Sequence, residues 1–128
     1  MTYSRSPIYC VPSMNADTQQ YLPLSPATLH ILLALTGGEL HGYGIMLESA
    51  RQSGGQYKIG PGTLYDNLKK LLAAGLVEES QPENPETGAR RMFQLTAAGH
   101  GVFAAEVERL SVVLRHARRS IQLAERRS

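Results

Sequence analysis

The hydrophobic and polar positions of the chain change their period several times, and each change marks an expected element. Residues 1–23 follow no helical or alternating period and hold three prolines, which indicates an extended arm that is a candidate for disorder. A first helix begins at the N-cap Ser25 with Pro26 in its first turn, and the Gly37–Gly38 pair ends it. Its expected buried face comprises Leu29, Leu32, Leu33 and Thr36.

Two more helices follow before the period changes to that of strands. The second is expected at about 42–52, with a buried stripe of Tyr43, Met46, Leu47 and Ala50. The third has Gly60 as its N-cap, Pro61 as its first residue and Gly75 as its C-terminal stop. Its leucines fall within an arc of about 100°, the width of a core-facing stripe. They are Leu64, Leu68, Leu71 and Leu72.

Residues 76–80 and 90–96 have the composition of two short strands. The proline- and glycine-rich stretch "QPENPETGA" between them predicts a β-hairpin with a long tip. Thr96 then caps a final helix whose hydrophobic residues alternate in spacing between four and three, a heptad pattern. This seam comprises Phe103, Val107, Leu110, Leu114, Ala117, Ile121 and Ala124.

This order of elements predicts a mainly α protein with a small β-hairpin, an α+β winged helix-turn-helix with a long C-terminal dimerisation helix. We expect the arm at 1–23, a DNA-binding domain at 24–96 and the dimerisation helix at 97–128. That helix would extend about 43 Å at 1.5 Å per residue, longer than a small winged domain is wide. A second copy is the simplest partner for the excess, although packing on the protein's own core is the alternative.

The polar side of the third helix has the composition that a helix in the DNA major groove requires. Small residues allow close approach, short polar side chains reach base edges and cations meet phosphates. The expected contacts are Gly62, Thr63, Tyr65, Asn67, Lys69 and Lys70. An ordinary solvated helix face is the alternative, since it would also hold lysine and aspartate.

The hairpin would serve as the wing, with Arg90 and Arg91 where its tip rejoins the second strand. Successive strand residues alternate in direction, so one of the two arginines should face outward toward DNA. Four glutamates make the hairpin net acidic, and the arginines could instead pair with them. These are Glu78, Glu79, Glu83 and Glu86.

Composition and isolated motifs narrow the alternatives. The formal charge of +2 and pI near 8.9 are only mildly basic. Cys10 is the single cysteine, so no intrachain disulfide or cysteine-based zinc site is expected. The chain shows no secretory signal and no membrane-spanning run, which favours the cytoplasm. A metal sensor using His100 and His116 is a minor alternative, and we predict no cofactor and no enzymatic activity.

The stretches "LHGYGIMLE", "GPGTLYDNLKKLLAAGLVEE" and "GARRMFQLTAAGHGVF" together resemble the PadR family of bacterial transcriptional regulators. The resemblance covers about residues 24–115. It implies a homodimeric repressor that binds a palindromic operator in double-stranded DNA and a small-molecule effector as a candidate regulator. It assigns DNA contact to Thr63, Tyr65 and Lys69 or Lys70, with Arg90 or Arg91 in the wing. The single C-terminal helix resembles the short branch of the family.

A winged-helix protein-interaction module without sequence-specific DNA binding is the second functional hypothesis. In that case the outward face of the third helix would bind a protein. Salt separates the two hypotheses, because binding through several phosphate contacts weakens log-linearly as salt rises.

Overall fold

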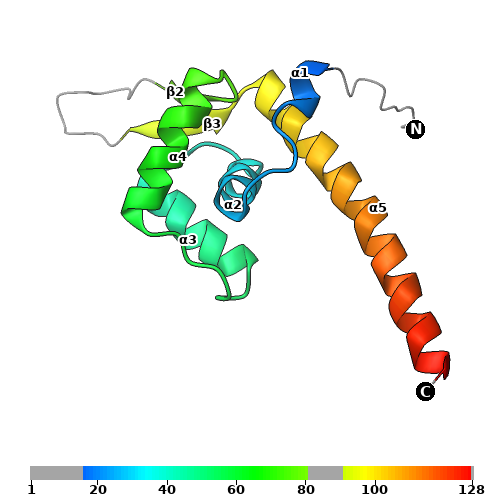
Figure 1. Ribbon diagram of the computed structural model, residues 1–128. Coiled ribbons are helices and arrows are strands. Elements are labelled where there is room, and N and C mark those ends of the chain that lie inside the picture. Colours follow the sequence, from blue (N-terminus) through cyan, green and yellow to red (C-terminus); the bar gives the residue numbers. More distant parts are fainter. Residues whose placement is uncertain (1–15, 81–90, 128) are drawn as a thin grey trace. The chain divides into compact units, whose positions relative to one another are not determined.

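The computed structural model describes residues 16–80 and 91–127, and its backbone divides into two compact units. One unit comprises residues 23–103. The other combines the N-terminal segment to Leu22 with the segment from Ala104 onward. The predicted winged helix-turn-helix lies in the first unit, and the prediction of a long C-terminal helix is also confirmed (Figure 1).

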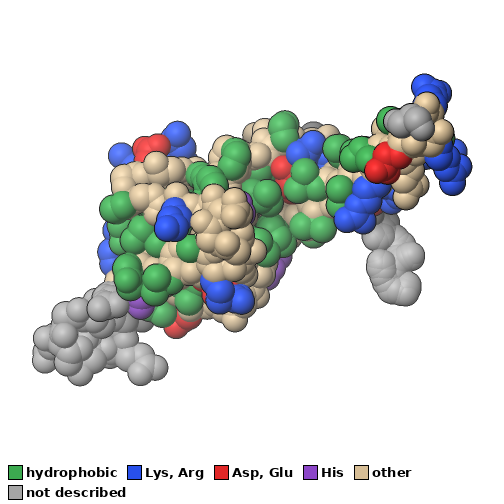
Figure 2. Space-filling view, turned by 90° about the horizontal axis from the view of Figure 1, so that it is seen from below, with side chains coloured by type: hydrophobic (Ala, Val, Ile, Leu, Met, Phe, Trp, Pro, Cys, Tyr) green, Lys and Arg blue, Asp and Glu red, His purple; other side chains and the backbone are tan. Residues whose placement is uncertain are grey.

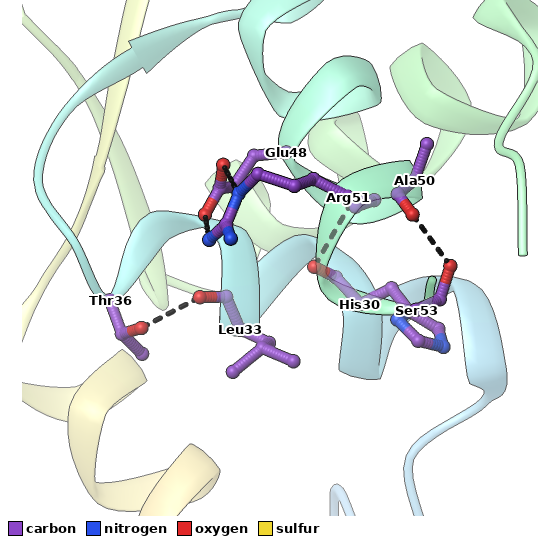
Figure 3. Close-up of polar contacts among 8 residues, drawn as sticks. His30, Leu33, Thr36, Glu48, Ala50, Arg51 and Ser53 are labelled. Atoms are coloured by element: carbon purple, nitrogen blue, oxygen red, sulfur yellow. Dashed lines mark hydrogen bonds and ion pairs between the residues drawn. The ribbon is translucent and has the colours of Figure 1, made fainter. Parts of the chain in front are cut away.

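Three helices form the body of the larger unit: α2 (Pro26–Leu35), α3 (Gly42–Gln52) and α4 (Pro61–Ala73). Helix α2 packs against both of the others, and α3 also packs against α4. Ser25 caps α2 as predicted, and its side chain accepts a hydrogen bond from the Thr28 amide. Figure 3 shows side chains of α2 and α3 around this contact, among them His30 and the ion pair of Arg51 with Glu48. Ser49 on α3 is fully buried and donates a hydrogen bond to the His30 carbonyl oxygen at 3.3 Å. This bond joins α2 to α3 inside the core.

The predicted buried faces of α2 and α3 are only partly correct: Leu32 is buried, Leu29, Leu33, Met46 and Ala50 are half-buried, and the other predicted residues are exposed. In α2, Thr36 is exposed and the buried residues are Ala27, Ile31, Leu32, Ala34 and Leu35. This helix is apolar on nearly every side, so periodicity cannot select its inward face. In α3, Gly42, Ile45 and Ser49 are buried, whereas Tyr43 and Leu47 are more than half exposed. A glycine and a serine occupy two of the three core positions there, and a hydrophobic pattern does not detect either of them.

The sheet has three short strands in the order β1–β3–β2, all antiparallel. The predicted hairpin is confirmed as β2 (Val77–Ser80) and β3 (Met92–Leu95), shorter than expected at both strands. Val77 pairs with Leu95, and both are buried together with Phe93. The additional strand β1 (Leu40–His41) pairs with β3 and was not predicted, because two residues carry no detectable period. The predicted tip at 81–89 lies outside the described residues.

Close packing joins the end of α4 to the start of α5 (Ala97–Arg127). Gly75 ends α4 as predicted, with the positive φ of 75° that favours glycine. The Thr96 hydroxyl caps α5, accepting from the Gly99 amide at 3.0 Å and donating to the Gly75 carbonyl at 2.7 Å. A β-carbon at Gly99 would lie 2.0 Å from the Leu76 carbonyl oxygen, so this junction has no space for a side chain.

The second unit contains α1 (Ala16–Gln19) and α5 from Ala104 onward. The short helix α1 corrects the prediction of an extended arm for that part of residues 1–23; residues 1–15 lie outside the described residues. Glu106 is buried and forms a bidentate ion pair with Arg109. Every described residue of α5 from Ser111 onward is exposed. No helix in the described segments is both long and hydrophobic enough to span a bilayer.

Candidate nucleic-acid interface

Helix α4 has one buried face and one exposed face, as predicted. Leu64, Leu68 and Leu71 are in the core. The exposed face includes Gly62, Thr63, Tyr65, Asp66, Lys69 and Lys70. Gly60 and Pro61 set the start of the helix, so Gly62 and Thr63 lie in its first turn. In helix-turn-helix proteins this first turn is the part that meets base edges.

Asn67, the remaining predicted contact on α4, is half-buried and its amide is used within the protein. The Thr28 hydroxyl donates a hydrogen bond of 2.9 Å to Asn67 Oδ1. Asn67 Nδ2 in turn donates to the Thr63 carbonyl oxygen at 2.8 Å. Asn67 therefore ties the first turn of α4 to the start of α2, and so holds the Thr63 backbone in place.

Tyr65 lies close to the beginning of α3. A β-carbon built on Gly42 would lie 2.2 Å from the Tyr65 hydroxyl oxygen and 2.9 Å from ring atom Cζ. The tip of the ring therefore fills the space that a side chain at Gly42 would need. Tyr65 remains 46% exposed, so the rest of its ring is available to a ligand.

Arg91 immediately precedes β3 and forms a bidentate ion pair with Glu79 of β2. Arg91 Nε donates to Glu79 Oε2 at 2.7 Å, and Nη2 donates to Oε1 at 2.9 Å. These hydrogen bonds hold the pKa of Glu79 below its ordinary value. The guanidinium also lies 5.2 Å from the centre of the Phe93 ring, within range of a cation–π contact.

The sequence left two possibilities for each wing arginine: it faces outward toward DNA, or it pairs with a glutamate of the hairpin. Arg91 pairs with a glutamate. The remaining wing residues of that prediction, Arg90, Glu83 and Glu86, lie outside the described residues. Glu78 instead accepts a hydrogen bond from Gln94 at 2.7 Å. The two carboxylates that follow each other in β2 thus have different partners.

The two predicted lysines of α4 differ in their surroundings. Lys70 Nζ lies 3.5 Å from Asp66 Oδ2, one helical turn away, and both side chains are well exposed. Lys69 faces the wing and lines a hollow of about 370 Å³ between α4 and β3. Its other lining residues are Tyr65, Leu68, Leu72, Arg91 and Phe93. The fold thus brings Tyr65, Lys69 and Arg91 together at one hollow, although Arg91 is far from the other two in sequence.

A second hollow of about 380 Å³ shares Tyr65 and Arg91 with the first. It adds His41, Gly42 and Tyr43, which were not predicted as site residues. The side chain of His41 caps α3, because its Nδ1 accepts a hydrogen bond from the Gly44 amide at 2.9 Å. The sequence pattern places Tyr43 in the core, and only its 57% exposure identifies it as a surface residue. No sequence signal could have placed these residues beside Arg91, because β1 brings them there by pairing with β3.

The predicted seam of α5 is on the surface of the single chain. Phe103 and Leu110 are half-buried, and Val107, Leu114, Ala117 and Ile121 are exposed. Hydrophobic side chains also extend along the helix in Figure 2, and the basic side chains gathered toward its C-terminal end are all arginines. Among the described residues there is no group of three or more side chains suited to holding a metal ion.

A family model, two sequence relatives and one solved structure are similar to this chain. The model of the "Transcriptional regulator PadR-like family" matches residues 31–105. Transcriptional regulator Rv3488 of Mycobacterium tuberculosis is 33% identical over 87 residues, 68% of this chain and 78% of that protein. An uncharacterized 37.1 kDa protein in transposon TN4556 of Streptomyces fradiae is 36% identical over 85 residues, 66% of this chain but only 23% of its own length. The solved structure of Bacillus subtilis PadR in complex with operator DNA is 25% identical, with a TM-score of 0.58. That similarity covers 66% of this chain and 48% of the Bacillus chain.

Proposed function

The chain belongs to the PadR-like family of transcriptional regulators, and we propose that it is a homodimeric repressor that binds a palindromic operator in double-stranded DNA. The observation that carries the DNA-binding part is the hollow that Tyr65, Lys69 and Arg91 line together. Two cations from different elements flank it, an arrangement suited to a phosphate group of a DNA backbone. The structural similarity to Bacillus subtilis PadR, solved in complex with operator DNA, also supports this proposal.

The residues of α4 and the wing divide into three roles in this proposal. Gly62 and Thr63 approach base edges from the first turn of α4. Tyr65, Lys69, Lys70 and Arg91 contact the backbone, and Arg90 is retained as a second wing contact. Asn67 acts indirectly, because its hydrogen bonds to Thr28 and Thr63 position the first turn of α4.

We assign dimerisation to α5. Most of the hydrophobic seam on this helix is exposed in the single chain, and burying it against a second copy would stabilise the pair. A two-fold dimer predicts half-sites centred one helical turn of DNA apart, about 10 bp, or a small multiple of it. Family membership alone supports three further parts of the proposal: cytoplasmic location, absence of enzymatic activity and release of repression by a small molecule.

The test is a binding titration of the purified protein against the DNA upstream of its own gene and against an unrelated duplex. Both duplexes are titrated at about 50 mM and about 200 mM salt, a range over which several phosphate contacts change affinity strongly. We expect preferential binding to the upstream duplex, with log-linear weakening as salt increases. Absence of binding to either duplex at low salt would exclude DNA as the partner and favour the protein-interaction module. Equal binding to both would contradict sequence-specific recognition of the upstream DNA.

A further inference from the structure

We infer that Gly42 is a positioning residue for Tyr65, and that the missing side chain of this glycine sets the geometry of the proposed DNA-binding surface. The functional consequence rests on the proposed DNA binding, whereas the packing of Tyr65 on Gly42 does not. Gly42 is buried and has no side chain with which to contact DNA. Its effect would therefore be transmitted through the tyrosine.

The space beside Gly42 is already filled. A β-carbon there would lie 2.2 Å from Tyr65 Oη, 2.9 Å from Cζ and 3.4 Å from Cε1. All three atoms belong to the same side chain, so the tip of one ring occupies this space. Approaches below 3.0 Å essentially never occur for a real β-carbon. Any side chain at this position would therefore displace the Tyr65 ring.

The backbone at Gly42 gives no separate reason for glycine. It is the first residue of α3, and it is absent from the positive-φ glycines of the described segments, which are Gly38, Gly54, Gly55 and Gly75. Alanine is also the better helix former. Gly44, in the same turn of the helix, provides a contrast, because its β-carbon would meet nothing nearer than 3.4 Å, an ordinary van der Waals contact. The close approach of Tyr65 is thus the feature that requires glycine at position 42.

The position of the Tyr65 ring affects the whole surface between α3, α4 and the wing. Tyr65 and Arg91 line both hollows, one with Gly42 and Tyr43 and the other with Lys69. Displacing the ring would change the walls of both hollows at once. A single methyl group at Gly42 would therefore disturb the surface beside Lys69 and Arg91 without removing any residue proposed to contact DNA.

A double-mutant cycle with Gly42→Ala and Tyr65→Phe tests this inference. Phenylalanine lacks the hydroxyl oxygen of the closest approach, and its ring tip needs only a small shift to accommodate a β-carbon. With Tyr65 intact we expect Gly42→Ala to weaken binding to the upstream duplex about tenfold, a loss within the range of coupling between contacting residues. In the Tyr65→Phe background the same substitution should weaken binding much less. Gly44→Ala is the matched control and should leave affinity nearly unchanged.

The four proteins of the cycle are also compared by thermal unfolding without DNA. We expect Gly42→Ala to lower the Tm when Tyr65 is intact and to lower it clearly less in the Tyr65→Phe background. Equal decreases in both backgrounds would overturn the inference, since the Tyr65 hydroxyl, the closest atom, would then not be what the alanine displaces. This measurement separates the two proposals. If the wild-type protein binds no DNA, the proposed function fails, and the unfolding cycle still decides whether Gly42 positions Tyr65.

Discussion

Arg91 of the wing donates two hydrogen bonds to Glu79, at 2.7 Å and 2.9 Å, so its charge is already paired in the free protein. The guanidinium edge that would receive a phosphate bidentately is occupied by a carboxylate. If the wing contacts DNA as proposed, a phosphate must either replace Glu79 or use the remaining N–H groups of Arg91. Glu79 should therefore attenuate DNA binding.

The first prediction concerns this attenuation. Replacing Glu79 by glutamine frees the charge of Arg91, and DNA binding should tighten roughly two- to fivefold, the range of an exposed ion pair. Glu78→Gln is the matched control, because it removes the same charge from the neighbouring position, where the partner is Gln94. The affinities of both variants for one duplex at one salt concentration decide the question. Equal tightening would attribute the effect to net charge and not to the pairing of Arg91.

The second prediction follows from the pKa of Glu79, which the hydrogen bonds from Arg91 lower from its ordinary value of 4.5. The folded-state pKa is then below the unfolded-state value. The ion pair consequently stabilises the fold above about pH 4.5, and this contribution is lost as pH falls through the folded-state pKa. Urea unfolding of wild type and Glu79→Gln should show a stability difference at neutral pH that disappears in acid. A difference that grew toward low pH would contradict the assigned direction of the shift.

The third prediction separates the two lysines of α4. Lys69 lines the hollow with Arg91, whereas Lys70 lies 3.5 Å from Asp66, which offsets part of its charge. We expect Lys69→Ala to reduce the salt-dependence slope by about 1 and to weaken binding to all sequences similarly. Lys70→Ala should have a smaller effect, and the difference should narrow in an Asp66→Asn background. A larger loss for Lys70→Ala would show that the hollow beside the wing is not the main phosphate contact.

The fourth prediction tests the dimer. Leu114 belongs to the seam and is 50% exposed, and Ile121 continues the same face. Leu114→Glu should yield a monomer in sedimentation equilibrium, because a charge in a hydrophobic interface is costly unless it is paired. Val112→Glu is the control. Val112 is also exposed, but its side chain is rotated about 200° around the helix axis from that of Leu114 and so lies on a different face. Loss of the dimer in both variants would place the interface on a different face of α5.

The fifth prediction compares two glycines of α5. A β-carbon at Gly99 would lie 2.0 Å from the backbone oxygen of Leu76, whereas at Gly101 it would meet nothing within 4 Å. Gly99→Ala should destabilise the fold by about 1–3 kcal/mol or more, as overpacking does. Gly101→Ala should stabilise it by about 0.5–1 kcal/mol through helix propensity. Urea unfolding measures both free energies, and similar effects would mean that the junction between α4 and α5 can adjust to a side chain.

Local chemistry made the start and end of α4 predictable. Pro61, Gly75 and the leucine spacing act through short-range steric and hydrophobic effects that are visible in any window of the chain. The same holds for Thr96 as the cap of α5. The inward faces of α2 and α3 were not predictable. The first is apolar nearly all round, and the second buries Gly42 and Ser49.

The candidate site also has features that the local sequence predicts and features that it does not. Its members on α4 follow from the pattern of one helix, and the residues that carry the family resemblance are also local in sequence. The pairing of Arg91 with Glu79, the commitment of Asn67 to Thr28 and the place of Tyr65 over Gly42 are not local. Each depends on a contact between two different elements.

The sequence by itself therefore determined the order of the four longer helices and the hairpin, the limits of α4 and the division of that helix into a buried and an exposed face. These properties depend on dihedral preferences and on the period of hydrophobic residues, which neighbouring residues decide. Only the tertiary structure decided that Arg91 is paired, that the amide of Asn67 is already bonded and that Gly42 must lack a side chain. Those outcomes depend on distances of a few ångströms between α2, α3, α4 and the wing, and packing alone determines such distances.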